Sequence, residues 1–272
     1  MKKLFLFLAV CGSFSVKILS QDEKIMVDAP SLQSLYIEAW SGGKAVASAT
    51  GFVIRSKTQN YLITNWHVVT NKAADNHKWL PGANTTPDQI RIRHRNAQVE
   101  TDKFYVGIES LLDDKGKPLY KEFSKDGKTI DVVAIPLRDT SHLNTSLFPV
   151  DYKFTNESIM LSPSELATVV GYPKGAWSEL FLPIWKTGTI ASEVTVDQGG
   201  MPIIFIDMLG FHGMSGSPVF YTTSMVIDVN GNNNFTGRQT YFLGVFSGEI
   251  EELQLGVLWK SAYLKKLFDN LE

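Results

Sequence analysis

The segment of the chain best suited to covalent chemistry is a serine with a glycine close on either side. Ser215 lies in "FHGMSGSPVF", residues 211–220, between Gly213 and Gly216 and directly before an apolar run. Small neighbours let a substrate carbonyl approach, and glycine permits tight backbone geometry that aims successive N–H groups at one point. Such a donor stabilises the oxygen anion that develops during acyl transfer by about 3 kcal/mol. The segment therefore predicts a nucleophilic serine.

A serine hydroxyl is a poor nucleophile unless a base takes its proton. The candidate base is His67 in "YLITNWHVVT", residues 61–70, which we expect at the end of a buried β-strand. A titratable ring there costs free energy unless it finds partners. The candidate group to orient this ring is Asp131, which opens "DVVAIPL". Asp126 in "KDGK" competes for that role, but Asp131 adjoins an apolar strand where it can be buried.

Each of these residues also has a plain structural interpretation. Ser215 could belong to an ordinary glycine-serine turn, His67 could be a core histidine bonded to the backbone, and Asp131 could cap a loop. The chemical hypothesis depends on the three residues occurring together.

The three blocks "LITNWHVV", "DVVAIPL" and "GMSGSPVF", in this order, resemble the signature blocks of the chymotrypsin-like (trypsin-like) serine peptidases. Within that family they are most similar to the bacterial, disulfide-free branch that includes glutamyl endopeptidases and the protease domains of heat-shock proteases. The resemblance covers roughly residues 35–270. It implies that Ser215 is the nucleophile, His67 the general base and Asp131 the residue that fixes the imidazole. It also implies an oxyanion hole made by the backbone N–H groups of Gly213 and Ser215.

The segment "GVFSG" resembles the family strand that lines the substrate cleft. Ser247 in this segment matches a serine that usually supports the buried aspartate. The resemblance implies that its backbone, together with Gly248, pairs with an extended substrate by strand addition.

Two departures from the family pattern bear on activation and specificity. Met214 stands where digestive members place the aspartate that receives a new N-terminus, so activation by that route is not expected. Leu209 stands where tryptic members hold an acidic residue, and Phe246 where glutamyl endopeptidases carry a histidine. We therefore expect Leu209 and Phe246 to border a pocket for a small or modest apolar side chain at P1, the residue before the cleaved bond.

The elements that must position these residues are short runs of β-branched and aromatic residues bounded by turns, about six in each half of the chain. We expect an all-β fold of two six-stranded antiparallel β-barrels, chymotrypsin-like, with a C-terminal α-helix. In "WKSAYLKKLFDNLE" the large apolar residues recur at helical spacing. The expected divisions are a signal peptide (1–20), a loose lead-in (21–34), a first barrel with the His and Asp (35–150), a second barrel with the Ser, oxyanion hole and pocket (151–257) and the helix (258–272).

The first twenty residues differ in composition from the rest. "MKK" is followed by the apolar run "LFLFLAV" and by the small and polar "CGSFSVKILS", which is typical of a secretory signal peptide. The apolar run is too short to span a bilayer comfortably. We expect export to a bacterial periplasm or to the exterior, with lipid attachment at Cys11 as the weaker alternative.

The charge balance argues against a nucleic-acid partner. The net charge is −2 and the pI is about 6.2, without the basic surplus of nucleic-acid-binding proteins. The one basic run, "RIRHR", alternates Arg91, Arg93 and Arg95, which on a strand share one solvated face. The expected partners are protein or peptide substrates, with no nucleic acid and no stable membrane insertion. The oligomeric state stays open.

Cysteine and histidine usage limits the other chemistries. Cys11 is the only cysteine, so the mature chain has no disulfide, thiol nucleophile or cysteine metal site. His77, His94 and His142 show no ligand-like spacing, and we expect neither a metal nor a cofactor. The function favoured by the sequence is a secreted or periplasmic serine endopeptidase. The alternative is a catalytically silent trypsin-like fold that binds proteins or peptides.

Overall fold

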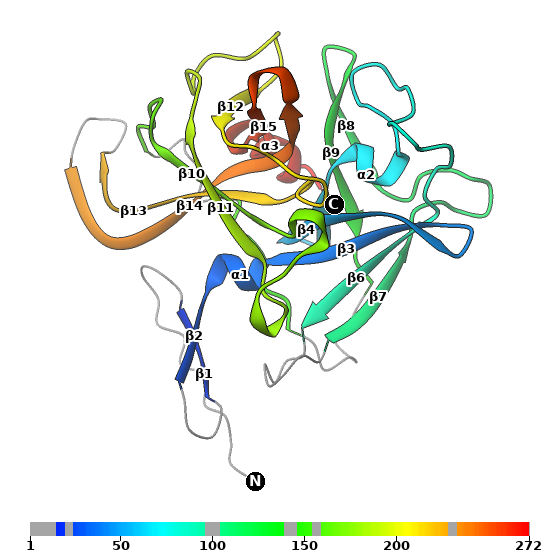
Figure 1. Ribbon diagram of the computed structural model, residues 1–272, viewed down its shortest axis with the longest axis horizontal. Helices are drawn as coiled ribbons and strands as arrows, with labels where there is room; N and C mark the ends of the chain where they lie inside the picture. Colours follow the sequence, from blue (N-terminus) through cyan, green and yellow to red (C-terminus); the bar gives the residue numbers. More distant parts are fainter. Residues whose placement is uncertain are drawn as a thin grey trace.

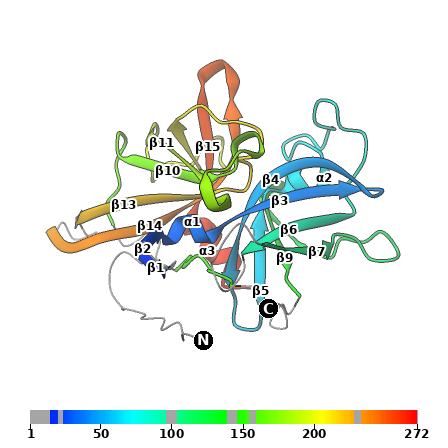
Figure 2. The same cartoon turned by 60° about the horizontal axis from the view of Figure 1, so that its bottom comes forward.

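Two bodies of β-structure lie side by side, and Figures 1 and 2 show them from two directions. The computed structural model describes residues 15–19, 24–95, 104–138, 146–153, 159–227 and 233–271. Strands dominate these residues, and helices are few and short. The all-β class expected from the short runs of β-branched and aromatic residues is confirmed.

The N-terminal body is an antiparallel sheet of seven strands in the order β7-β6-β3-β4-β5-β9-β8. Its edge strands β7 and β8 are not paired with each other, so the described strands form an open sheet where a closed six-stranded barrel was expected. The strand that the sequence did not predict is β8, because "KEFSK" is short and mostly polar. The strands are β3 (Ser34–Ser41), β4 (Lys44–Arg55), β5 (Asn60–Thr64), β6 (Gln89–Arg95), β7 (Phe104–Ser110), β8 (Lys121–Lys125) and β9 (Lys128–Pro136).

The C-terminal body is a closed barrel of six antiparallel strands in the order β10-β11-β12-β15-β14-β13. This half agrees with the prediction. Closure leaves no free sheet edge in the barrel itself. The strands are β10 (Leu166–Gly171), β11 (Ile184–Ile190), β12 (Ile203–Asp207), β13 (Pro218–Ile227), β14 (Asn233–Ile250) and β15 (Leu255–Lys260).

Three large apolar clusters stabilise the described part of the fold: one lies inside each body and one lies between them. In the cluster between the bodies, Phe52 and Ile63 from the N-terminal sheet meet Phe242 and Val170 from the barrel. Phe52 and Phe242 are almost completely buried, with ring centroids 5.4 Å apart. Burying such a side chain stabilises the fold by about 1.5–3 kcal/mol. The interface between the two bodies is therefore packed like a hydrophobic core. This packing fixes the position of side chains on one body relative to those on the other.

The chain closes with the helix α3 (Ser261–Phe268). Leu264 and Phe268 are one turn apart on its buried face, and Leu271 follows beyond its end, all within the cluster between the bodies. The helical spacing seen in the sequence is thus the spacing of residues that seal this core.

The segment before the N-terminal sheet contains regular structure where a loose lead-in was expected. Strand β2 (Lys24–Asp28) leads into a single helical turn, α1 (Ala29–Gln33), whose Leu32 is buried. Most of the expected signal peptide lies outside the described residues, although Ser15–Leu19 forms strand β1 and pairs with β2. No helix in the described part of the chain is long and apolar enough to cross a membrane.

Candidate active site

His67 lies on a single helical turn. The sequence had predicted it at the end of a strand. Strand β5 ends at Thr64, and the helix α2 (Trp66–Thr70) follows. The turn closes at Asn71, whose backbone adopts a left-handed conformation (φ 57°) and donates its N–H to the carbonyl of His67. Trp66 and Val69 are buried in the core of the N-terminal sheet, so the helix is anchored on that side. The His67 side chain is left 18% exposed.

Asp131 is displaced from the regular ladder of β9. The pairing between β8 and β9 shifts register between Glu122 and Phe123, so Asp131 and Val132 have no opposite residue on β8. Such bulges redirect side chains and are frequent next to functional sites. The carbonyl of Asp131 accepts a bond of 2.6 Å from the Asn65 side chain, which ties the bulge to the start of α2. The carboxylate is buried next to His67.

The Asp131 carboxylate binds His67 through two atoms. One oxygen accepts the backbone N–H of His67 at 2.8 Å, and the other lies 2.7 Å from the ring Nδ1. The Ser247 hydroxyl donates to this second oxygen as well. With Nδ1–H donated to Asp131, the opposite nitrogen Nε2 is left to accept a proton. Asp126, the competing candidate, lies in the turn between β8 and β9 with its side chain 83% exposed.

Ser215 lies in a tight turn at the end of the segment that joins β12 to β13. Met214 is completely buried in the barrel core, and its carbonyl accepts the N–H of Ser217 at 3.0 Å. Gly216 has φ +81°, and a Cβ there would collide with the backbone carbonyl of Thr50. Glycine is therefore required after the nucleophile candidate. Met214, at the place of the family aspartate, acts here as a core anchor.

The backbone N–H groups of Gly213 and Ser215 donate to no acceptor among the described residues. The preceding carbonyl, that of His212, accepts the Lys174 N–H at 2.5 Å. Because a trans peptide places its C=O and N–H on opposite sides, the N–H of Gly213 points away from Lys174. Two neighbouring unpaired donors are what binding of an oxyanion requires.

Thr50 on β4 holds the nucleophile turn from the other body, a role that the sequence analysis missed. Its N–H donates to the carbonyl of Ser215 at 2.9 Å, and its hydroxyl donates to the carbonyl of Gly213 at 2.8 Å. The same hydroxyl accepts the N–H of Tyr172 at 3.1 Å. Thr50 is completely buried, so these bonds are made without competition from solvent. No signal in the sequence marks this threonine, because its partners are distant in the chain.

The Ser215 hydroxyl donates to the carbonyl of Ser247 at 3.4 Å. Within the described part of the chain, no hydrogen bond joins Ser215 to the His67 ring. Ser247 thus contacts both sides of the site, through its hydroxyl to Asp131 and through its carbonyl to Ser215. The structure therefore brings His67 and Asp131 into direct contact and connects Ser215 to them through Ser247.

The residues predicted to bind substrate occupy different environments. The Leu209 side chain is 47% exposed, whereas Phe246 is 1% exposed in the barrel core. Gly248 has open space where a Cβ would lie, so its backbone can be approached. A Cβ on Gly210 or on Gly256 would lie 2.8 Å from the Phe246 ring. The ring therefore fills the space between these two glycines.

Two charged side chains contact the segment that contains Leu209. The Lys186 ammonium donates to the carbonyl of Leu209 at 2.7 Å and lies 4.1 Å from the centre of the Phe211 ring. Glu249 accepts the N–H of Gly210 at 2.8 Å. Burial lowers the pKa of Lys186, and the charge of Glu249 opposes that shift. Sequence reasoning had not singled out Lys186 or Glu249.

Of the remaining histidines, His212 directly precedes Gly213 in the site, whereas His77 and His94 contact other residues. His77 packs against Trp66 and bonds to Thr129 at 2.9 Å. His94 is buried, and burial lowers its pKa to about 4. His142 lies outside the described residues. The described residues contain no group of three acidic, histidine or cysteine side chains that could hold a metal ion.

Comparison with protein families gives one match: the model of the trypsin-like peptidase domain matches residues 49–227. This range includes His67, Asp131 and Ser215. Comparison with curated protein sequences finds no match.

Three solved structures, two of them of serine proteases, are similar to the chain at low sequence identity. The thermostable serine protease AL20 from an extremophilic microorganism is 12% identical, with a TM-score of 0.50 over 89% of this chain and 97% of that chain. An inactive form of Rv3671c from M. tuberculosis H37Rv is 19% identical, with a TM-score of 0.46 over 88% of this chain and 84% of that one. The serine endoprotease from Yersinia pestis is 13% identical, with a TM-score of 0.47 over 88% of this chain, which spans 62% of that one. The likeness to AL20 concerns the fold alone.

Proposed function

Because the chain belongs to the trypsin-like peptidase family, we propose that it is an exported serine endopeptidase that cleaves proteins or peptides through an acyl-enzyme. The observation that carries the proposal is the double contact of Asp131 with the backbone and ring of His67, next to a serine turn with two unpaired N–H donors. Two contacts from one carboxylate fix both the position and the tautomer of the imidazole.

In the proposed mechanism the Ser215 oxygen attacks the substrate carbonyl carbon while His67 Nε2 takes the hydroxyl proton. The resulting oxyanion accepts hydrogen bonds from the N–H groups of Gly213 and Ser215. His67 returns its proton to the leaving amine, the C–N bond breaks, and an ester on Ser215 remains. Water then attacks the ester with His67 again as base, which releases the acid and restores the hydroxyl. Throughout, Asp131 accepts the Nδ1–H and stabilises the imidazolium.

Before this sequence can begin, the Ser215 hydroxyl must exchange its long bond to the Ser247 carbonyl for one to His67. A bond of 3.4 Å is weak, and rotation about one side-chain torsion is sufficient to break it. Catalytic hydrogen bonds are often loose in free enzymes and tighten when substrate binds.

We propose a small or modest apolar side chain at P1. By family resemblance, Leu209 and Phe246 border this pocket. The contact of the Phe246 ring with Gly210 and Gly256 supports a shallow pocket, because the ring occupies volume that a large P1 side chain would need. The backbone of Ser247 and Gly248 would bind the substrate as an added strand. Export is proposed from the composition of residues 1–20 alone.

The second candidate function is a silent scaffold that binds proteins or peptides without cleaving them. The bond of the Ser215 hydroxyl to Ser247, in place of His67, is the observation in its favour. Fold alone does not decide between the two.

Reaction with a fluorophosphonate probe distinguishes them. The peptidase proposal predicts covalent labelling of the wild-type protein that disappears in Ser215→Ala and His67→Ala. The matched control is Ser162→Ala, which removes an exposed serine and should label like wild type. Absence of labelling in pure, folded wild-type protein would support the scaffold.

A further inference from the structure

Among the described residues, the outer edge of the N-terminal sheet presents apolar side chains and backbone groups with no strand beside them. Of the described strands only β6 pairs with β7, which ends the sheet on this side (Figure 1). Phe104, Val106 and Ile108 alternate along β7 and so share one face. They are 38%, 49% and 45% exposed. The exposed face of β7 is therefore apolar, and its outer edge can pair with a further strand.

Protein sheets usually protect such edges with charges, proline or a bulge, because an open edge recruits other strands. Residues 104–108 contain no charge and no proline. The pairing of β6 with β7 also runs from Gln89↔Ser110 to Arg95↔Phe104 without a register shift. The one charged residue of β7, Glu109, is buried, so no charge, proline or bulge protects the exposed stretch 104–108.

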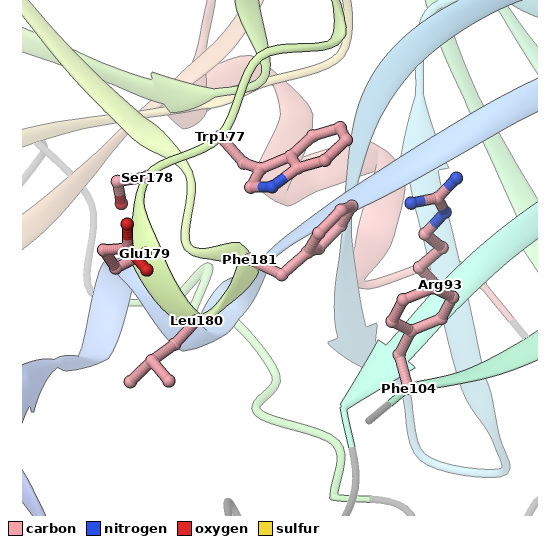
Figure 3. Close-up of a pocket in the computed structure, with 7 residues that line it drawn as sticks. All are labelled: Arg93, Phe104, Trp177, Ser178, Glu179, Leu180 and Phe181. Carbon is pink, nitrogen blue, oxygen red and sulfur yellow. The ribbon is translucent and has the colours of Figure 1, made fainter. Parts of the chain in front are cut away.

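A pocket adjoins the Phe104 end of the edge. Its volume is about 400 Å³, and Figure 3 shows Trp177 and Phe181 extending from one loop toward Arg93 and Phe104 of the sheet. Trp177 is 49% exposed. The complete lining is Arg93, Phe104, Trp177, Ser178, Glu179, Leu180 and Phe181.

Arg93 gives the pocket a charged group with unused donors. Its guanidinium lies 4.7 Å from the ring centre of Tyr36 and 4.8 Å from those of Phe104 and Phe181, which hold the planar group in place. Its ion pair with Glu38 is long, at 3.7 Å, and it makes no hydrogen bond to any described residue. A planar guanidinium with free N–H groups suits a carboxylate.

The loop wall of the pocket is held in an uncommon backbone conformation. Leu180 and Phe181 have φ values of 57° and 58°, which are costly for bulky residues. The Arg95 guanidinium donates to both of their carbonyls, at 2.9 and 2.7 Å. The Tyr172 hydroxyl donates to the carbonyl of Phe181 at 3.3 Å. The pocket is therefore formed in advance of any ligand.

We propose that the β7 surface, defined as Arg93, Phe104, Val106, Ile108, Trp177 and Phe181, binds an extended acidic and apolar segment of a partner protein. The segment adds to the sheet as a strand along β7. Its apolar side chains cover Val106 and Ile108, and a carboxylate at its pocket end binds Arg93. Since this binding uses none of the residues assigned to hydrolysis, it is independent of the proposed peptidase activity.

The test is fluorescence anisotropy with a fluorescein-labelled peptide, Ser-Val-Thr-Val-Thr-Glu-Phe amide, and the full chain carrying Ser215→Ala to prevent cleavage. We expect saturable binding that Val106→Asp or Ile108→Asp weakens about tenfold or more, because a charge replaces buried apolar contact. Val46→Asp is the matched control: Val46 is likewise 40% exposed on a strand, and its replacement should change nothing. Methylation of alternate peptide amides should abolish binding by blocking the backbone pairing.

A second comparison tests the role of Arg93. Replacement of the peptide Glu by Gln should weaken binding to the protein with Arg93 but leave binding to Arg93→Gln unchanged. The proposal is overturned if the peptide does not saturate, or if it binds the β7 variants and the Val46 control alike. It is also overturned if sedimentation shows a dimer that Val106→Asp dissociates, since a second copy would then occupy the edge.

Discussion

Thr50 is the residue through which the N-terminal sheet holds the nucleophile turn, and Thr50→Val tests that role. Valine keeps the shape and the backbone bond to the Ser215 carbonyl but removes the hydroxyl. The carbonyl of Gly213 then loses its donor and the N–H of Tyr172 its acceptor, both in a buried position. Leaving a buried polar group unpaired costs about 1–3 kcal/mol, so with two such groups we expect the free energy of unfolding to fall by about 2–6 kcal/mol.

The same substitution should slow the chemistry. The Gly213 carbonyl belongs to the same residue as one N–H proposed to bind the oxyanion. When this carbonyl loses its bond to Thr50, the position of that N–H becomes less fixed. Loss of a whole oxyanion donor costs about 100–1,000-fold in rate, and a loosened donor should cost about 10–100-fold. The rate constant of fluorophosphonate labelling measures this effect, and urea unfolding measures the stability.

Thr50→Ser is the matched control, because it keeps the hydroxyl and both bonds and loses only a methyl group worth about 1 kcal/mol. The rate constant of fluorophosphonate labelling should stay within about twofold of the wild-type value, because both hydrogen bonds are kept. If Thr50→Val is less stable but labels at the wild-type rate, the hydroxyl only supports the fold. If neither quantity changes, the assigned hydrogen bonds are wrong.

Three further predictions follow from single side chains. Ser247→Ala removes a donor to the Asp131 carboxylate and should slow fluorophosphonate labelling about tenfold with the fold retained; an unchanged rate would contradict the contact. Burial lowers the pKa of His94 from 6.5 to about 4, so the unfolded chain takes up a proton first as the pH falls. Stability should therefore drop by about 3 kcal/mol between pH 6.5 and 4, and urea unfolding of His94→Leu should lack that drop. Phe246→Val should shift cleavage of a peptide library toward larger P1 side chains, whereas an unchanged profile would remove Phe246 from the pocket.

The sequence predicted the elements whose residues obey a local period. The alternation of β6 and the helical spacing of Leu264, Phe268 and Leu271 were visible because burial follows these periods. The short runs of β3 and β10 were visible by their β-branched and aromatic residues. Strand β8 was missed because its residues are mostly exposed and polar. The N-terminal sheet was expected to close, but closure depends on the pairing of edge strands that lie far apart in the chain.

The site was predictable only where a short motif fixes local chemistry. The glycines around Ser215 and the apolar run after Asp131 identified candidates, and the structure brings Asp131 into contact with His67. The contributions of Thr50 and Lys174 were not predictable, because they act through backbone groups of residues distant in the sequence. The turn that carries His67 was predicted as strand, since five residues are too few to show a helical period.

The most direct test of the proposed chemistry is a crystal structure of the protein treated with a peptide boronate. The proposal predicts a covalent bond from boron to the Ser215 oxygen, with one boronate oxygen within hydrogen-bond distance of the N–H groups of both Gly213 and Ser215. It also predicts that the imidazole of His67 reaches the adduct while keeping its bond to Asp131. A boronate bound at another residue, or with its oxygen facing neither N–H group, would contradict the mechanism.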